Sequence, residues 1–317
     1  MITTRKIFVC VLATIGSTLM AQTVKKINSK HVEQAIQSPT DNLINGRGCF
    51  TPAPSDEWEA ALQQLIAARE AASLTGAKAL ASYNIPVVIH IIHGGQALGT
   101  YPNISNAQAV SQINVLNNDF AGTGLNATTY PSTAFTAYAT AAGLPTANKD
   151  ALGRPKISNF NISFCLATIN KSGGAMSEIG IDRVNFNTFT LTSGYTSKDP
   201  ANAAYSTPAT FQSFIDNIVK PQTIWDPTKY MNIWTTDENI STGLLGFATF
   251  PVGVTLAGIT GSGTASNDGL WCWTKAFGNT GTLDPSYNKG RTATHEIGHW
   301  LGMRHIWAMV VVQLIIA

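Results

Sequence analysis

Charged residues are scarce in this sequence. Asp, Glu, Lys and Arg make up 12% of the 317 residues, and the formal net charge is +2. No basic run or stripe is present, so nothing indicates nucleic acid as a partner. Internal repeats and low-complexity tracts are also missing. The length suits one large domain or two modest ones, each with a sizeable core.

The apolar stretch near the N-terminus is too short for a membrane span. Arg5 and Lys6 precede an apolar stretch over 7–20, and Ala21-Gln22 follows it. This layout is typical of a secretory signal peptide, which we predict over residues 1–21. The alternative is a membrane anchor, but about 14 apolar residues are few for a bilayer. We therefore expect a secreted, extracellular protein without stable membrane insertion.

Cysteine is rare as well. Beyond Cys10 in the predicted leader, the chain has only Cys49, Cys165 and Cys272. An odd number of thiols in an exported chain indicates that one is free, with a role of its own, while the other two pair. The sequence alone does not fix which cysteines pair.

Secondary-structure signals divide the chain near residue 82. A polar stretch over 42–54 leads into a predicted amphipathic helix over 55–76, and we assign 22–82 to a propeptide-like segment. Beyond it strands and helices alternate, which predicts an α+β fold with a mixed twisted sheet and packed helices. The expected strands cover 85–92, 160–169, 230–236 and 243–251; the expected helices begin after the caps Ser105 and Thr207 and near Arg291, and Pro221 is expected to end the second.

The densest chemical signal is "HEIGHWLGMRH", from His295 to His305. On a helix, His295 and His299 are separated by about 400° of rotation and about 6 Å of rise, so both rings project from one face. Such a pair suits two ligands of one tetrahedral zinc ion. Glu296 lies beside the first histidine, where it can act as general base on a water molecule.

His305 joins the same centre only if the chain turns sharply. On an unbroken helix it would be rotated by roughly 120° from His299 and displaced by about 9 Å. Gly302 supplies the turn, because glycine adopts the positive φ that ends a helix. The combined pattern H-E-x-x-H-x-x-G-x-x-H is highly specific. The alternative reading, solvated histidines on an ordinary helix, explains fewer of these residues.

These motifs resemble the metzincin metallopeptidases, specifically the pappalysin (pregnancy-associated plasma protein-A type) group in its bacterial secreted branch. The stretches "IPVVIHIIHGG", "VKPQTIWDPTKYMNIWTT", "GLLGFATFP" and "GRTATHEIGHWLGMRHIW" are similar to that group and come in its order. The resemblance covers about 83–307, which we assign to the catalytic domain. It implies a metzincin-like sheet with a zinc-binding active-site helix, and a secreted zinc endopeptidase made as a latent zymogen that acts on proteins or peptides.

The resemblance also implies roles for individual residues. His295, His299 and His305 would bind one Zn2+, and Glu296 would be the base. The family further allows Ca2+, although no dense cluster of acidic residues marks a site.

Two further roles follow from the resemblance. An edge strand beginning Gly243, Leu244, Leu245 and Gly246 would pair with extended substrate; the alternative is a plain buried strand. In such precursors a propeptide cysteine blocks the metal, which makes Cys49 the candidate; the alternative is an incidental thiol. Cys165 and Cys272 would then remain as a disulfide pair.

The sequence departs from the family pattern after Trp307. The uncharged segment "AMVVVQLIIA" (308–317) stands where the family has a Gly-Asp pair, cysteine-containing loops and a methionine-bearing turn. We therefore expect a C-terminal subdomain that is largely missing, an aberrant apolar tail, weak zinc binding and little cleavage. Two other functions stay open: a non-catalytic exported binding product, and a small-molecule hydrolase that uses the same metal.

Overall fold

The structure is a computed structural model of the 317-residue chain. It describes residues 43–44, 47–51, scattered positions within 57–68, 82–124, 159–240, 243–252, 263–303 and 305. All of them fall within one compact unit, residues 39–317. The predicted leader (1–21) and the apolar tail (308–317) lie outside the described residues.

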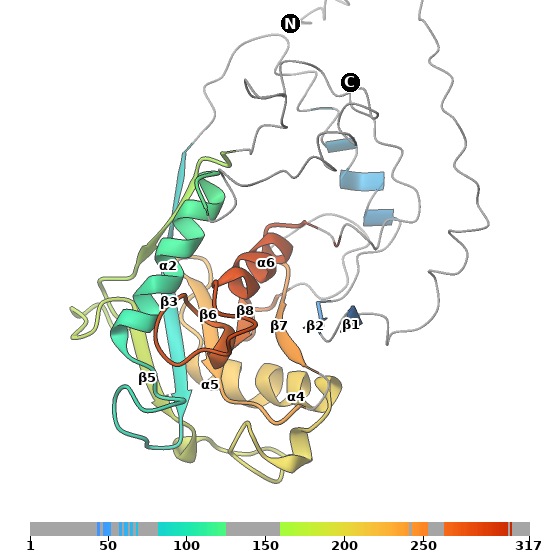
Figure 1. Ribbon diagram of the computed structural model, residues 1–317. Coiled ribbons are helices and arrows are strands. Elements are labelled where there is room, and N and C mark those ends of the chain that lie inside the picture. The colour runs from blue at the N-terminus through green and yellow to red at the C-terminus, as the bar shows by residue number, and fades with distance from the viewer. Residues whose placement is uncertain are drawn as a thin grey trace, which may run out of the picture. The chain divides into compact units, whose positions relative to one another are not determined.

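A mixed sheet forms the centre of the described fold, with the strand order β1-β2-β7-β8-β6-β3-β4 and with β5 paired to β3 (Figure 1). The central strand β3 runs parallel to β4, β5 and β6, and β6 runs parallel to β8. β7 is antiparallel to β8, and β2 lies parallel along the other side of β7. The strands are β1 (Leu43–Ile44), β2 (Arg47–Cys49), β3 (Tyr83–His93), β4 (Ile162–Leu166), β5 (Ile181–Asn185), β6 (Met231–Thr236), β7 (Leu244–Ala248) and β8 (Leu270–Trp273).

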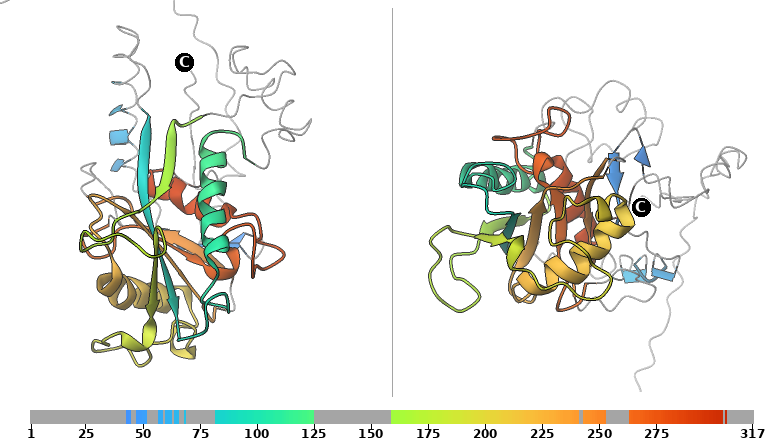
Figure 2. Two further views of the ribbon diagram at one scale, coloured as in Figure 1. Left: turned by 90° about the vertical axis from the view of Figure 1, so that its left-hand side faces the viewer. Right: turned by 90° about the horizontal axis from the view of Figure 1, so that it is seen from below.

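Helices cover both faces of the sheet, as the turned views show (Figure 2). α2 and α6 pack on one apolar cluster, and α4, η6 and α5 pack on another. Successive side chains of a strand point to opposite faces of the sheet, so one strand contributes to both clusters. On β6, Ile233 belongs to the first cluster and Trp234 to the second. The helices are α2 (Asn106–Phe120), α4 (Pro208–Phe214), the π-helix η6 (Ile215–Val219), α5 (Lys220–Thr223), α6 (Arg291–Trp300) and the 3-10 turns η4 (Phe186–Thr188), η5 (Ala203–Tyr205) and η7 (Thr274–Ala276).

The predicted helix starts are confirmed, and one predicted end is wrong. Ser105 caps α2 by accepting the Gln108 amide, and Thr207 forms a capping box at the start of α4. Pro221 does not end the second helix. After α4 the backbone forms the π-helix η6 and then continues as α5. Pro221 lies in the first turn of α5, where a backbone N–H donor is not needed.

The predicted helix over 55–76 falls mostly outside the described residues. The positions described within it, among them Glu57 and Trp58, are helical. Trp58 is buried and its ring lies 5.9 Å from that of Phe250, so this helix packs on the end of β7.

The predicted disulfide between Cys165 and Cys272 is not present: both are free thiols. Cys165 is on β4 and Cys272 on β8, with β3 and β6 between them. Neighbouring strands lie about 4.8 Å apart, which separates the two Cα atoms by at least about 14 Å, twice the reach of a disulfide, and the register adds a further offset along the strands. The sheet order therefore excludes the pair.

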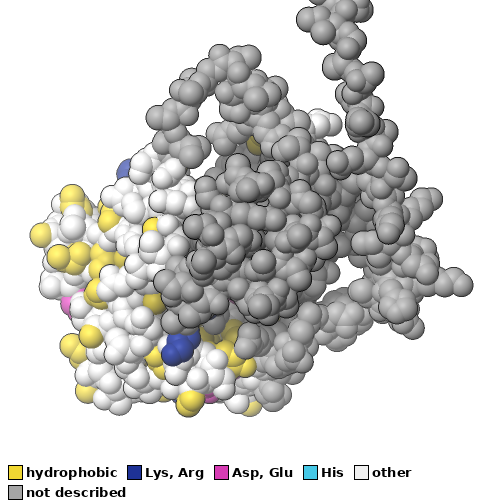
Figure 3. Space-filling model, turned by 45° about the horizontal axis from the view of Figure 1, so that its top comes forward, with side chains coloured by type: hydrophobic (Ala, Val, Ile, Leu, Met, Phe, Trp, Pro, Cys, Tyr) yellow, Lys and Arg dark blue, Asp and Glu magenta, His cyan; other side chains and the backbone are white. Residues whose placement is uncertain are grey.

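The surface reflects the low charge content. On the face in Figure 3, the described surface is mostly uncharged, with hydrophobic side chains scattered among polar ones. None of the described helices is long and apolar enough to cross a membrane.

Candidate metal centre

Helix α6 carries the histidine motif and is held at both ends. At its start, Arg291 Nε lies 3.1 Å from Asp119 Oδ2 on α2, and the Thr294 hydroxyl donates to the same oxygen at 2.8 Å. At its end, Trp300 Nε1 donates to Asp268 Oδ1 at 2.8 Å, just before β8. These contacts fix the helix against the sheet independently of its histidines.

The turn after α6 is closed by backbone hydrogen bonds. Gly302 has φ of 91°, and its amide donates to the His299 carbonyl, while the Met303 amide donates to the Gly298 carbonyl. This is a Schellman motif, which requires a residue in the left-handed region and so favours glycine. The predicted role of Gly302 in reversing the chain is confirmed, and His305 returns toward the helix.

Three imidazole nitrogens converge as a result. The Nε2 atoms of His295, His299 and His305 are separated by 3.2, 3.0 and 2.9 Å. The thiol of Cys49 joins them: one ligand atom from each of the four residues lies within 4.8 Å of the others. The four come from two distant parts of the sequence, Cys49 from one and the histidines of 295–305 from the other.

The electrostatic setting favours neutral imidazoles. Burial, followed by the neighbouring histidines, lowers the pKa of His305 to about 3, and burial lowers that of His299. His299 Nδ1 lies 2.7 Å from the Met303 carbonyl oxygen, which can only accept, so Nδ1 is the donor. Its Nε2 therefore presents a lone pair to the centre, the form that binds a metal.

The donor set fits zinc. Four donors of the Cys/His type match the preference of a tetrahedral zinc ion. For Zn–N distances of 2.0–2.1 Å, tetrahedral geometry separates two nitrogens by about 3.3 Å, close to the observed separations.

Glu296 is buried beside this centre, with 1% of its surface exposed. Burial raises the pKa of its carboxyl to about 8, partly offset by hydrogen bonds from Cys49 and Thr51. A Cβ atom built on Gly246 would lie 2.7 Å from Glu296 Cγ, so the glutamate side chain packs directly on the backbone of β7.

Residues 49–51, which we call the blocking segment, lie across the site. Cys49 pairs with Gly246 of β7, and the Phe50 amide donates to the Gly246 carbonyl at 3.2 Å. The Cys49 thiol donates to Glu296 Oε2 at 3.5 Å. Burial, and then the charge of Glu296, raise the pKa of this thiol well above its usual value. A cation between the histidines would reverse that shift.

The structure therefore brings together most of the predicted site residues. The predicted edge strand is β7, although Gly243 precedes it and β2 occupies its outer side. Thr51 was not foreseen, since no motif distinguishes it from other threonines. The close approach of Gly246 to Glu296 was also missed, although glycine within a strand is a signal of close approach.

A cavity of about 230 Å³ opens beside the histidines. Its lining includes His295 and His299 together with apolar side chains from the end of α2 and its surroundings, Phe120, Phe160 and Met303.

Three histidines and a buried glutamate on one helix and its turn define the metal-dependent hydrolase type of site. Comparison with known proteins agrees. Residues 213–311 match the family model described as pregnancy-associated plasma protein-A. The chain is 37% identical over 70 residues to an extracellular metalloprotease of Arthroderma otae (22% of this chain, 23% of that protein). A protein of the same description from Colletotrichum graminicola is 45% identical over 64 residues (20% and 21%).

Among solved structures, mature mirolysin of Tannerella forsythia in complex with a cleaved peptide is 32% identical, with a TM-score of 0.48, over 72% of this chain and 66% of mirolysin. The chain thus spans about a quarter of the length of the curated relatives and just under two thirds of mirolysin. Over the matched residues the chain is therefore similar to metallopeptidases of the pregnancy-associated plasma protein-A (pappalysin) family.

Proposed function

We propose that this protein is the latent precursor of a secreted, zinc-dependent endopeptidase. His295, His299 and His305 hold the zinc ion, Glu296 is the general base, and Cys49 occupies the fourth position until the blocking segment leaves. The observation that carries the proposal is the convergence of three Nε2 atoms and one thiol within 4.8 Å.

The chemistry follows from the arrangement of the chain. A bound zinc ion supplies Lewis acidity, which polarises a peptide carbonyl and makes water a nucleophile at neutral pH. Glu296 accepts the proton of that water at its carboxylate and delivers it to the leaving amine. Its burial raises the pKa of the carboxyl above the usual range, which makes it a stronger base once it is ionised.

Substrate binding is assigned to β7. Once β2 departs, the outer amides and carbonyls of Leu244–Ala248 become free to pair with an extended peptide. Proteins and peptides are therefore the proposed substrates.

The test uses the full chain and the variant Cys49→Ala, which removes the blocking thiol. We expect Cys49→Ala to cleave a quenched fluorescent peptide library faster than the wild type, and Cys49→Ala/Glu296→Gln to lose at least about 100-fold of that rate. Equal cleavage with and without Glu296 would refute the assignment of the base.

Zinc content is measured in parallel, by atomic absorption after dialysis. His299→Gln is expected to lower the zinc affinity strongly, whereas Glu296→Gln retains zinc. Zinc binding with no cleavage by any variant would favour the non-catalytic binding product. Near-stoichiometric zinc and robust cleavage by the 317-residue chain would overturn the sequence-based expectation of a weak, poorly active centre.

A further inference from the structure

We propose that Thr51 is a second latch on the site, which holds the blocking segment closed without any metal. This inference rests on the proposed role of Glu296 and adds to it a regulatory contact. Cys49 faces the histidines, whereas Thr51 ties the segment to the base and to the edge strand at once.

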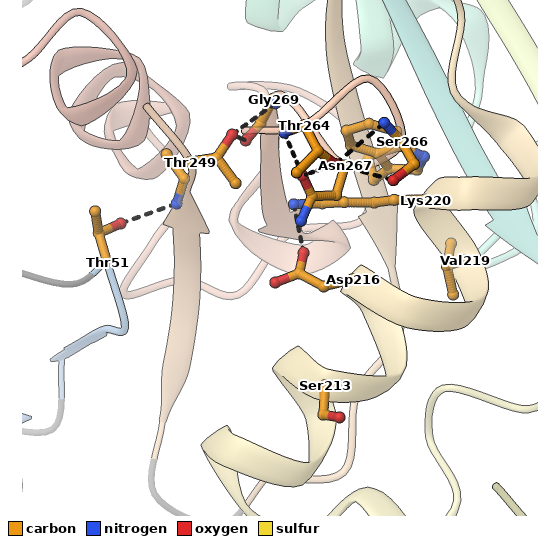
Figure 4. A network of polar contacts seen from close by, with 12 residues as sticks. Thr51, Ser213, Asp216, Val219, Lys220, Thr249, Thr264, Ser266, Asn267 and Gly269 are labelled. Atoms are coloured by element: carbon orange, nitrogen blue, oxygen red, sulfur yellow. Dashed lines mark hydrogen bonds and ion pairs between the residues drawn. The ribbon is translucent and has the colours of Figure 1, made fainter. Parts of the chain in front are cut away.

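Two hydrogen bonds converge on the Thr51 hydroxyl. It donates to Glu296 Oε2 at 3.1 Å, and it accepts the Ala248 amide of β7 at 2.9 Å. The second bond is drawn in Figure 4, where the Thr51 side chain points at a backbone nitrogen of β7. Thr51 itself is 4% exposed. The Thr51 side chain thus binds a carboxylate oxygen of Glu296 and a backbone amide of β7 at the same time.

The Thr51 bond dominates the polar environment of Glu296. Within the described part of the chain, the donors to this carboxylate are the Thr51 hydroxyl at 3.1 Å and the Cys49 thiol at 3.5 Å. A hydroxyl is the stronger donor, because S–H groups donate weakly. Without it, the buried carboxylate keeps only the thiol, and leaving a buried charged acceptor poorly satisfied is costly.

The contact point is rigid on the enzyme side. Glu296 packs on Gly246 so closely that a methyl group there would overlap it, and the helix that carries it is anchored at both ends. The hydroxyl of Thr51 therefore meets a fixed carboxylate and a fixed amide. Lifting the blocking segment requires both bonds to break together with the bond from the Phe50 amide to the Gly246 carbonyl.

The latch is also placed where release matters. When Thr51 leaves, the carboxylate that takes the proton and an amide of the substrate-binding strand become free in the same step. Blocking and unblocking of the base and of the strand are thus coupled through one residue.

The experiment measures opening of the segment in the full chain stripped of metal with EDTA. Hydrogen exchange at the Phe50 and Ala248 amides is followed by mass spectrometry of peptides, because these amides exchange when the segment lifts. We compare the wild type with Thr51→Val, which keeps the shape and loses the hydroxyl, and with Thr51→Ser, which keeps the hydroxyl. Thr249→Val is the matched control, since among the described residues its buried hydroxyl bonds to Gly269 alone.

We expect Thr51→Val to speed exchange at the Phe50 amide by at least about tenfold, because the substitution removes both hydrogen bonds of the Thr51 hydroxyl; the Ala248 amide also exchanges faster, because it loses its acceptor. Thr51→Ser should stay within about twofold of the wild type, and Thr249→Val should leave the Phe50 amide unchanged. If Thr51→Val does not fold, Thr51→Ala is measured in its place.

Unchanged exchange in the Thr51 variant, or an equal rise in the Thr249 control, would overturn the latch. The assay uses neither zinc nor peptide cleavage, so it separates the two proposals. A chain that fails to bind zinc but shows the tenfold contrast would refute the proposed function and keep the latch. A chain that binds zinc but shows no difference in exchange between Thr51→Val and the wild type would refute the latch and keep the proposed function.

Discussion

Replacing Asp216 by asparagine is expected to destabilise the protein more than replacing its partner Lys220 by methionine. The two form a buried ion pair, with Lys220 Nζ 2.8 Å from Asp216 Oδ1 (Figure 4). The lysine side chain is 0% exposed, whereas the aspartate is 19% exposed. The aspartate reaches water and the lysine does not, so the two substitutions leave very different residues behind.

The magnitudes follow from this asymmetry. In Asp216→Asn the buried ammonium loses its counter-ion, which costs roughly 3–5 kcal/mol. The rings of Trp234 and Phe247, whose centroids lie 5.2 and 5.0 Å from Nζ, contact the ammonium in both proteins and do not change the difference. The expected loss is therefore roughly 3–5 kcal/mol. In Lys220→Met the apolar stem is kept and the carboxylate can be hydrated, so we expect a loss of about 1 kcal/mol.

Urea unfolding of the metal-free chain, followed by tryptophan fluorescence, measures both variants against the wild type. Asp226→Asn serves as control, because its pair with Lys229 is exposed and should contribute little. The reasoning is refuted if Lys220→Met is as destabilising as Asp216→Asn, since that would mean that the exposure of the two partners does not decide the outcome.

Three further substitutions test the packing around Glu296 and the titration of a second carboxyl, Glu238. Gly246→Ala places a methyl group 2.7 Å from Glu296 Cγ, so urea unfolding should show a loss of about 1–3 kcal/mol, whereas Gly298→Ala, whose new Cβ meets nothing closer than 3.8 Å, should be neutral or slightly stabilising. Burial raises the pKa of Glu238 from 4.5 to about 7, so the folded state binds the proton more tightly and stability falls as pH rises from 4.5 to 7. Glu238→Gln should remove this loss, about 1 kcal/mol after solvent screening of a part-exposed group, and an unfolding difference from wild type that does not change with pH would contradict it.

Local signals predicted the elements that depend on local chemistry. The run of β-branched residues around Val87 gave the central strand, and Ser105 and Thr207 gave helix starts, because periodicity and capping act within a few residues. The turn at Gly302 was predictable for the same reason. The π-helix before Lys220 was missed; Lys220 packs on the rings of Trp234 and Phe247, which are remote in sequence, although its counter-ion Asp216 is only four residues away.

Long-range pairing was beyond the sequence. The order of strands decides that Cys165 and Cys272 stay apart, and nothing near either residue encodes that order. Thr51 and Glu296 are 245 positions apart, and their bond depends on the parallel pairing of β2 with β7. The histidines were predictable because one helix and one turn place them; the contacts of the blocking segment needed the whole sheet.

The pairing of β2 with β7 has a consequence for solubility. Every residue of β7 is buried, and its outer backbone groups are satisfied by β2. Without that partner, β7 would be an open, largely apolar strand at the border of the sheet, the kind of surface through which copies of a protein stick to each other. In this structure the border strand beyond β2 is instead β1, only two residues long. The β1–β2 pair thus prevents β7 of one molecule from pairing with a strand of another molecule. A chain that lacks β1 and β2 will avoid such association only while another peptide pairs with β7.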